Sequence, residues 1–230
     1  MERVVRTIDA IEVAPGGRRV VGLAGGVASG KTTLAEAIAA RLGDTAIVST
    51  DAFLLSNAEL DRRGLAMRKG FPESYDWNRF AATVDTLRSG ARSVTVPSYS
   101  HVRYDIEPGV EDEVPPASTV IVEGVNALQI PPGRERPLAY DLAVYLKTAE
   151  ADQRRWLTER LVASIRAAAD QPESFYHAMA TWPIEQIEEF AGQVWEAING
   201  PNLHRHIRPS RAFADLVVTK NGAHEIVSVG

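Results

Sequence analysis

One glycine-rich segment constrains the fold of this chain more than any other. It matches the phosphate-binding pattern G-x-x-x-x-G-K-[ST] at every fixed position and reads Gly25-Gly26-Val27-Ala28-Ser29-Gly30-Lys31-Thr32. An apolar, strand-like run (20–24) precedes it, and a helical pattern (32–42) follows it. Because the pattern needs this strand–loop–helix setting, the segment predicts a phosphate-binding loop at the end of a buried strand.

The residue types of this loop suit the phosphates of a nucleotide. Glycines let backbone N–H groups turn inward around phosphate oxygens, and the N-terminus of the following helix adds unpaired donors. Lys31 can reach the β- and γ-phosphates, and the Thr32 hydroxyl can bind Mg²⁺. We therefore predict that the segment from Gly25 to Thr33 binds ATP.

Composition places the chain among ordinary globular proteins. Its 230 residues suit one large α/β domain (1–230), and 45% of them are hydrophobic against 24% charged. A net charge of −5 disfavours a nucleic-acid partner, which a basic face would attract. No apolar run approaches the roughly 20 residues that span a bilayer, and residues 1–6 lack a secretory segment. With no cysteine for disulfides, we expect a cytoplasmic protein without a membrane partner.

Strand-like and helical patterns alternate along the chain. The predicted strands are 20–24, 45–49, 93–96, 119–122, 141–146, 213–219 and 224–229. The predicted helices are 32–42, 78–89, 150–169, 173–180 and 184–198. This alternation predicts an α/β fold of the P-loop NTPase type, with a doubly wound, mostly parallel sheet flanked by helices. Two proline-bearing segments, 107–117 and 130–137, are predicted to be surface loops.

Two carboxylates follow predicted strands at the points where those strands end. Asp51 comes just after the strand 45–49, and Glu123 comes directly after the strand 119–122. In open α/β sheets, ligands collect outside the carboxyl ends of the strands, where the phosphate loop also lies. One carboxylate there can accept the proton of an attacking hydroxyl, and the other can hold Mg²⁺ directly or through water.

Several segments beyond the loop resemble bacterial type I pantothenate kinases. They are S-T-D-A-F-L (49–54), R-G-L (63–65), K-G-F-P-E-S-Y-D (69–76), P-S-Y-S-H-V-R-Y-D-I (97–106), V-E-G-V-N-A-L-Q (122–129), I-N-G-P-N-L (198–203) and T-K-N-G-A-H (219–224). The resemblance runs from residue 20 onward, and K-G-F-P-E-S-Y-D together with Y-S-H-x-x-Y-D is specific to that family. The phosphate loop by itself is not specific to that family, because uridine kinases and phosphoribulokinases also contain it.

This resemblance implies a kinase that uses ATP and Mg²⁺ to phosphorylate a hydroxyl of pantothenate, the first step of coenzyme A synthesis. It implies that Lys31 holds the transferring phosphate, Thr32 binds Mg²⁺, Asp51 is the base and Arg160 stabilises the phosphoryl group. The positions that would line the acceptor pocket or its lid are Lys69, Tyr99, His101, Tyr104 and Asn202, and His224 would lie near the adenine. We also expect a homodimer.

The chain departs from the family pattern on the acceptor side. Two aromatic positions on the helix that carries Arg160 read Leu157 and Ser164 here, so one wall of the acceptor pocket is altered. The family is inhibited by coenzyme A, which competes with ATP. A basic position near the inhibitor's phosphates reads Glu36 in this chain, so the resemblance implies weak coenzyme A binding.

Two alternatives to a pantothenate kinase remain. One is a kinase of the same superfamily whose acceptor is a nucleoside, as in uridine kinase, or a sugar acid. The other is a nucleotide-binding module without transfer activity. A switch GTPase would carry N/T-K-x-D, whereas Lys220 is followed by Asn-Gly, and an assembly ATPase would have an aspartate where Glu123-Gly124 stands. Both absences favour a kinase.

Overall fold

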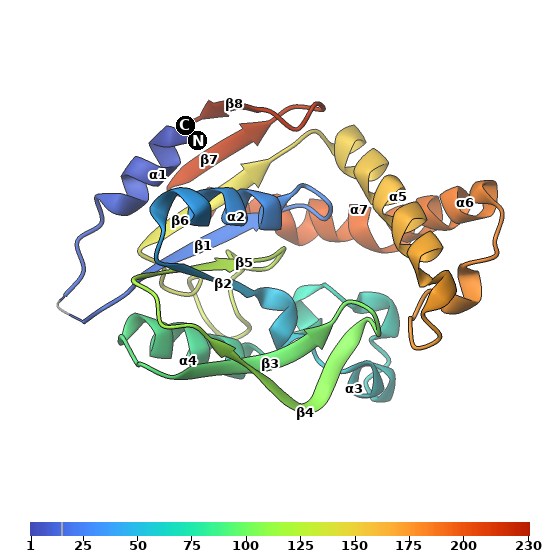
Figure 1. Cartoon of the computed structure of the whole chain (residues 1–230), viewed down its shortest axis with the longest axis horizontal. Coiled ribbons are helices and arrows are strands. Elements are labelled where there is room, and N and C mark those ends of the chain that lie inside the picture. Colours follow the sequence, from blue (N-terminus) through green and yellow to red (C-terminus); the bar gives the residue numbers. More distant parts are fainter. Residues whose placement is uncertain (15) are drawn as a thin grey trace.

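A six-stranded sheet organises the computed structural model, which describes residues 1–14 and 16–230 (Figure 1). The strands of this sheet are β1 (Arg19–Gly25), β2 (Thr45–Ser49), β5 (Thr119–Glu123), β6 (Leu142–Lys147), β7 (Leu216–Lys220) and β8 (Ile226–Val229). Their spatial order is β2-β5-β1-β6-β7-β8. The first five are parallel, and β8 is antiparallel to β7. This confirms the predicted mostly parallel α/β sheet.

Helices cover both faces of the sheet. They are α1 (Glu2–Asp9), α2 (Lys31–Leu42), α3 (Asn57–Arg62), α4 (Trp77–Arg88), α5 (Glu150–Ala167), α6 (Ile184–Val194) and α7 (Gly200–Asn202). One core cluster joins α1 and α2 to one face of the central strands. Two other clusters join α4 and the α5–α7 region to the opposite face. The central strands are therefore buried on both sides, which explains their continuous apolar runs.

The prediction of a surface loop at 107–117 was wrong, because most of this segment belongs to a second, two-stranded sheet. Residues Asp105–Val114 form β4, which pairs antiparallel with β3 (Val94–Ser100). Most of β4 is exposed and acidic, so its sequence lacks the alternation of apolar and polar residues that identifies a half-buried strand. The hairpin lies below the main sheet in Figure 1, beside α4. The segment 93–96 is thus part of a strand, although that strand lies outside the main sheet.

Other differences concern short or irregular helices. The predicted helix 173–180 is a series of turns with one 3-10 turn, His177–Met179. The segment is short and none of its residues is buried, so packing does not stabilise a helix there. Helix α6 ends at Val194, and the chain continues through two π-helical turns, Trp195–Asn199 and Leu203–Ile207. Helices α1 and α3 were not predicted. Within the residues described, no helix is long and apolar enough to cross a membrane.

Candidate functional site

The carboxyl ends of the parallel strands bring the candidate residues to one edge of the sheet. Glu123, the last residue of β5, pairs in register with Leu23 of β1 on one side and Ser49 of β2 on the other. The phosphate loop follows β1, and Asp51 lies two residues beyond Ser49 in a 3-10 turn, Thr50–Phe53. Three neighbouring strands therefore deliver the loop and both carboxylates to the same place, as the sequence predicted.

The phosphate loop closes on itself through its lysine. Lys31 is the first residue of α2, and its Nζ donates a hydrogen bond to the Gly26 carbonyl at 3.0 Å. Gly30 precedes it with φ +84°, a left-handed conformation that disfavours any residue with a side chain. Within this loop the N-terminus of α2 faces the space between the strand ends, where anions bind favourably.

Buried charges around Lys31 shift one another's ionisation. Burial lowers the pKa of Lys31, and the nearby cations Arg160 and Lys220 lower it further, whereas Glu123 and Asp51 oppose the shift. The lysine thus lies among two carboxylates and two other cations. Such a cluster of close, partly desolvated charges is typical of a functional site, because a structural role would seldom require it.

Glu123 and Thr32 provide a pair of oxygen donors beside the loop. Thr32 Oγ1 donates a hydrogen bond to Glu123 Oε1 at 2.9 Å. Burial raises the pKa of Glu123, while Lys31 and the Thr32 hydrogen bond counteract that rise. A hydroxyl and a carboxylate next to a phosphate site are the partial ligand set that Mg²⁺ completes with phosphate oxygens and water. The residues present therefore fit a magnesium ion.

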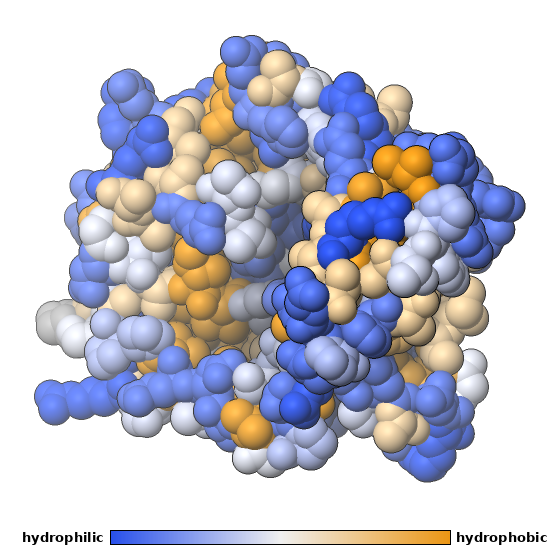
Figure 2. All heavy atoms as spheres, turned by 45° about the vertical axis from the view of Figure 1, so that its right-hand side comes forward, coloured by the Kyte–Doolittle hydropathy of each residue, from blue (hydrophilic) through white to orange (hydrophobic). Residues whose placement is uncertain are grey.

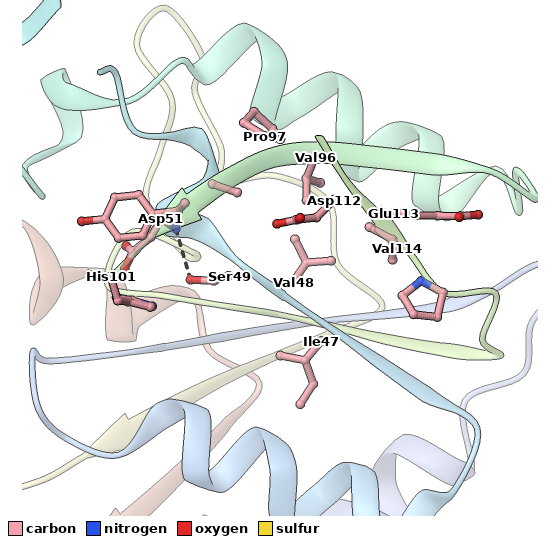
Figure 3. A pocket seen from close by; sticks show the side chains of 13 residues that line it. Ile47, Val48, Ser49, Asp51, Val96, Pro97, His101, Asp112, Glu113 and Val114 are labelled. Carbon is pink, nitrogen blue, oxygen red and sulfur yellow. Dashed lines mark hydrogen bonds between the residues drawn. The ribbon is translucent and has the colours of Figure 1, made fainter. Parts of the chain in front are cut away.

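A cavity of about 170 Å³ opens at Asp51, between β2 and the β3–β4 hairpin (Figure 3). Its walls come from three strands and the turn after β2: Ile47, Val48, Ser49, Asp51, Ala52, Val96, Pro97, Tyr99, His101, Asp112, Glu113, Val114 and Pro115. In Figure 3, Asp51 and His101 lie together at one end of this cavity, and Asp112 and Glu113 lie at the other. The face shown in Figure 2 is hollowed near its middle, with hydrophilic side chains around much of the rim.

Lys69 joins the predicted acceptor residues of the hairpin. Its Nζ donates to Asn57 Oδ1 at 2.6 Å and to the Tyr104 carbonyl, and it lies 4.4 Å from the centre of the Tyr104 ring. Tyr99 packs edge-on against both His101 and Tyr104, at 5.1 and 6.3 Å. Four of the five predicted acceptor residues are therefore gathered in one group.

Asn202 lies apart from that group. Its side chain is buried and donates to the Gly70 carbonyl at 2.8 Å, a carbonyl that Asn126 also reaches at 2.8 Å. It therefore ties α7 to the segment 69–76. His224 lies on the other side of the phosphate loop, where its ring stacks on Trp156 at 4.1 Å.

Residues that the sequence analysis missed complete both ends of the site. The Lys220 ammonium lies against Gly30 and 5.0 Å from the centre of the Trp156 ring, and burial lowers its pKa. Phe175 packs on Tyr104 at 5.3 Å, and Tyr176 lies 6.3 Å from Tyr104. Lys220 ends a strand, the same signal that identified Asp51 and Glu123. The two aromatic residues carried no comparable signal, because their segment was predicted to be a helix.

The positions that depart from the family pattern occupy different environments. Leu157 is buried in the core cluster shared by α5, α6 and the sheet, so it contributes to packing. Ser164 is half-buried on α5, one turn beyond Arg160, and Glu36 is exposed on α2.

Comparisons with known proteins agree with this geometry. Residues 20–156 match the phosphoribulokinase/uridine kinase family. The chain is 43% identical over 220 residues to the pantothenate kinase of Leifsonia xyli subsp. xyli, covering 91% of this chain and 68% of that protein. It is 40% identical over 242 residues to the pantothenate kinase of Sorangium cellulosum, covering 99% and 78%.

One solved structure is similar over nearly the full length of both chains. It is a putative fructose transport system kinase from Silicibacter sp. TM1040, with a TM-score of 0.73 and 26% identity over 94% of this chain and 97% of that one. ATP is the phosphoryl donor of such kinases. This chain belongs to the phosphoribulokinase/uridine kinase family of ATP-dependent kinases and, within it, to the bacterial pantothenate kinases.

Proposed function

We propose that this chain transfers the γ-phosphate of ATP to the hydroxyl of pantothenate. One observation carries the proposal: Asp51, whose charge acts on Lys31 of the phosphate loop, lines a cavity together with Tyr99 and His101. The relatives of the chain, at 36–43% identity, are named pantothenate kinases. Pantothenate is a short amide with a carboxylate and a primary hydroxyl, and the polar, aromatic side of this cavity offers partners for each group.

In the proposed reaction Asp51 acts as the base. The hydroxyl proton passes to the Asp51 carboxylate, the alcohol oxygen bonds to the γ-phosphorus, and the bond to the β–γ bridging oxygen breaks to give ADP and a phosphate ester. Lys31 and Arg160 stabilise the charge on the transferring group, since this chemistry depends on positioning and electrostatics. His101, Tyr99, Tyr104 and Lys69 orient the acceptor, Asn202 holds the segment that carries Lys69, and His224 lies beside the adenine.

We further propose that Mg²⁺ is held through Thr32 and Glu123. Their hydrogen-bonded oxygens adjoin the loop, and Mg²⁺ prefers one or two protein ligands together with phosphate oxygens. The ion, when bound, neutralises charge on the β- and γ-phosphates.

A sugar or nucleoside hydroxyl is the second candidate acceptor. The family resemblance implies that Ser164 replaces an aromatic residue on the acceptor side, and a similar solved structure is described as a putative fructose transport system kinase. A smaller side chain at that wall leaves room for a different acceptor.

A coupled assay of ADP release distinguishes these acceptors. Purified protein with ATP and Mg²⁺ is given pantothenate, uridine, glycerate or simple sugars. We expect pantothenate to have the highest kcat/KM. ADP release with a sugar or nucleoside and none with pantothenate would reject the proposed acceptor and retain the kinase chemistry.

We also propose that residues 1–230 act as one domain, that the chain works in the cytoplasm, where ATP is available, and that it forms a homodimer. The homodimer is proposed from family resemblance, and sedimentation equilibrium of the purified protein tests it directly. A mass of one chain at micromolar concentrations would contradict the dimer.

A further inference from the structure

Gly26 is a glycine that neither the loop pattern nor the backbone requires. The pattern G-x-x-x-x-G-K-[ST] fixes positions 25 and 30 and leaves 26 free. Gly30 has φ +84°, whereas Gly26 is outside the set of residues with positive φ. An alanine at position 26 would therefore be compatible with the local backbone, and the reason for glycine lies elsewhere in the fold.

The side chain of Gln153 lies directly against Gly26. A Cβ added to Gly26 would overlap Gln153 Oε1 and would lie 2.5 Å from its Cδ and 2.9 Å from its Nε2. Gln153 comes from α5, more than 120 residues away along the chain, and only 3% of its surface is exposed. The contact is therefore built by the tertiary fold.

Only one of the two polar atoms of the Gln153 carboxamide forms a hydrogen bond within the described residues. Its Nε2 donates to the Thr148 carbonyl at 3.3 Å, while its buried Oε1 has no hydrogen-bond partner among the residues that the structure describes. A buried polar atom without a partner destabilises the fold, so its presence beside the loop calls for an explanation.

The face of α5 that carries Gln153 also serves the rest of the nucleotide site. Residues 153, 156 and 160 follow the i, i+3, i+7 spacing of one helix face. Trp156 stacks on His224. Burial is the main cause that lowers the pKa of Lys31, and the charge of Arg160 lowers it further. One rigid helix therefore contacts the loop, the region beyond it and the charge cluster at Lys31.

We propose that Gln153 is a positioning residue for the phosphate loop. Its carboxamide packs on Gly26 and fixes that residue's carbonyl where Lys31 Nζ and the Ser29 amide reach it, at 3.0 and 3.3 Å. The same contact sets the distance between the loop and Arg160. Glycine at position 26 and glutamine at 153 are thus a matched pair, and the inference rests on the proposed ATP-dependent activity.

A double-mutant cycle tests the pair through ATP affinity, measured by calorimetry without any acceptor. Gly26→Ala should weaken ATP binding by about thirtyfold or more, and Gln153→Ala by about tenfold. The combined Gly26→Ala/Gln153→Ala variant should bind ATP about as tightly as Gln153→Ala alone, because the obstructing side chain is gone. Gln153→Glu should bind ATP more weakly than Gln153→Ala, since it adds a carboxylate beside the phosphates.

Two controls isolate the mechanism. Gly30→Ala should stay defective when combined with Lys220→Ala, since φ +84° disfavours alanine even after the neighbouring side chain is removed. Gln193→Ala makes the same substitution at an exposed position of α6 and should leave ATP affinity unchanged. Thermal unfolding of each variant shows which of them fold.

The kinetic readout separates positioning from general stability. Gln153→Ala should raise the KM for ATP and leave the KM for pantothenate unchanged. Wild-type ATP affinity in Gln153→Ala, or a combined variant as weak as Gly26→Ala, would overturn the proposal. Failure of the pantothenate kinase assignment would appear instead as inactivity of the wild-type protein toward pantothenate while ATP binding persists, so the two failures are distinguishable.

Discussion

At the scale of single residues, the site is a small group of charges whose ionisation is altered by burial. Burial lowers the pKa of Lys31 and raises that of Glu123, and the two groups partly offset each other. The charge of Asp51 raises the pKa of both groups. A phosphoryl group that enters this cluster would meet preorganised charges, and the protein would need little rearrangement to stabilise the transition state.

Replacement of the proposed base should separate binding from chemistry. Asp51→Asn keeps the shape of the side chain and removes its basicity, so kcat should fall by about two to four orders of magnitude while ATP affinity stays near wild type. Steady-state kinetics and ATP calorimetry give the two quantities. Asp85→Asn, at an exposed position of α4, is the matched control and should leave kcat unchanged. Full activity in Asp51→Asn would show that another group takes the proton.

The family resemblance implies that Ser164 replaces an aromatic residue in the acceptor wall, so we expect a high KM for pantothenate. Loss of an aromatic ring removes apolar contact area worth about 1–3 kcal/mol, which raises KM by one or two orders of magnitude. Ser164→Phe should therefore lower the KM for pantothenate. Ala163→Phe places the same ring on an exposed neighbouring position and should leave KM unchanged. An equal effect of the two substitutions would contradict the assigned wall.

At the scale of elements, strand ends and helix faces determine what each side chain meets. The end of β5 presents Glu123 to the loop, α2 presents Lys31 and Thr32, and α5 presents Arg160. We expect a substitution on the exposed face of one of these elements to affect ligands through charge.

Helix α2 tests that statement through Glu36, which is exposed one turn after Lys31. A carboxylate there repels the phosphates of coenzyme A, so inhibition by coenzyme A should be weak. Glu36→Lys should strengthen it, by about threefold to tenfold at low salt, and the gain should fade as ionic strength rises. Tight, ATP-competitive inhibition of the wild-type protein would exclude this account.

The end of β5 makes a prediction about pH. Because burial raises the pKa of Glu123 above its ordinary value of 4.5, the ligand-free fold holds this proton more tightly than the unfolded chain does. Its contribution to the free energy of unfolding is therefore greatest below pH 4.5 and is lost as pH rises through the folded pKa.

Magnesium and ADP should reverse that loss, because a bound cation favours the ionised carboxylate. The increase in Tm caused by Mg²⁺ and ADP should thus grow as pH rises above 4.5. Glu123→Gln should flatten the dependence. A wild-type increase in Tm that does not vary with pH would show that Glu123 does not couple to the ion.

At the scale of the whole molecule, the core beneath the cavity holds the site in place. Phe80 of α4 is fully buried and stacks on Phe53, which follows Asp51 by two residues, with ring centres 4.6 Å apart. Phe80→Ala should lower the free energy of unfolding by about 3–5 kcal/mol. Urea unfolding measures this, with Phe213→Ala as the control, because 42% of Phe213 is exposed and its removal should change little. A small effect at Phe80 would mean that the core can collapse around the gap.

Local patterns in the sequence determined the parts of this protein that depend on neighbouring residues. We could predict the phosphate loop, the buried parallel strands and the carboxylates at their ends. A few consecutive residues suffice to recognise the loop pattern and the apolar runs. The acidic strand β4 was mistaken for a loop, since its stability comes from pairing with β3 and its side chains face solvent.

Only the tertiary structure decided which distant residues meet. The contact of Gln153 with Gly26, the approach of Lys220 to Gly30 and the packing of Phe175 on Tyr104 join segments tens of residues or more apart. No local pattern encodes these contacts, because they follow from the order of strands in the sheet and from the face that α5 turns toward the loop. The sequence by itself determined the chemistry available at the sheet edge, and the packing of elements decided how that chemistry is positioned.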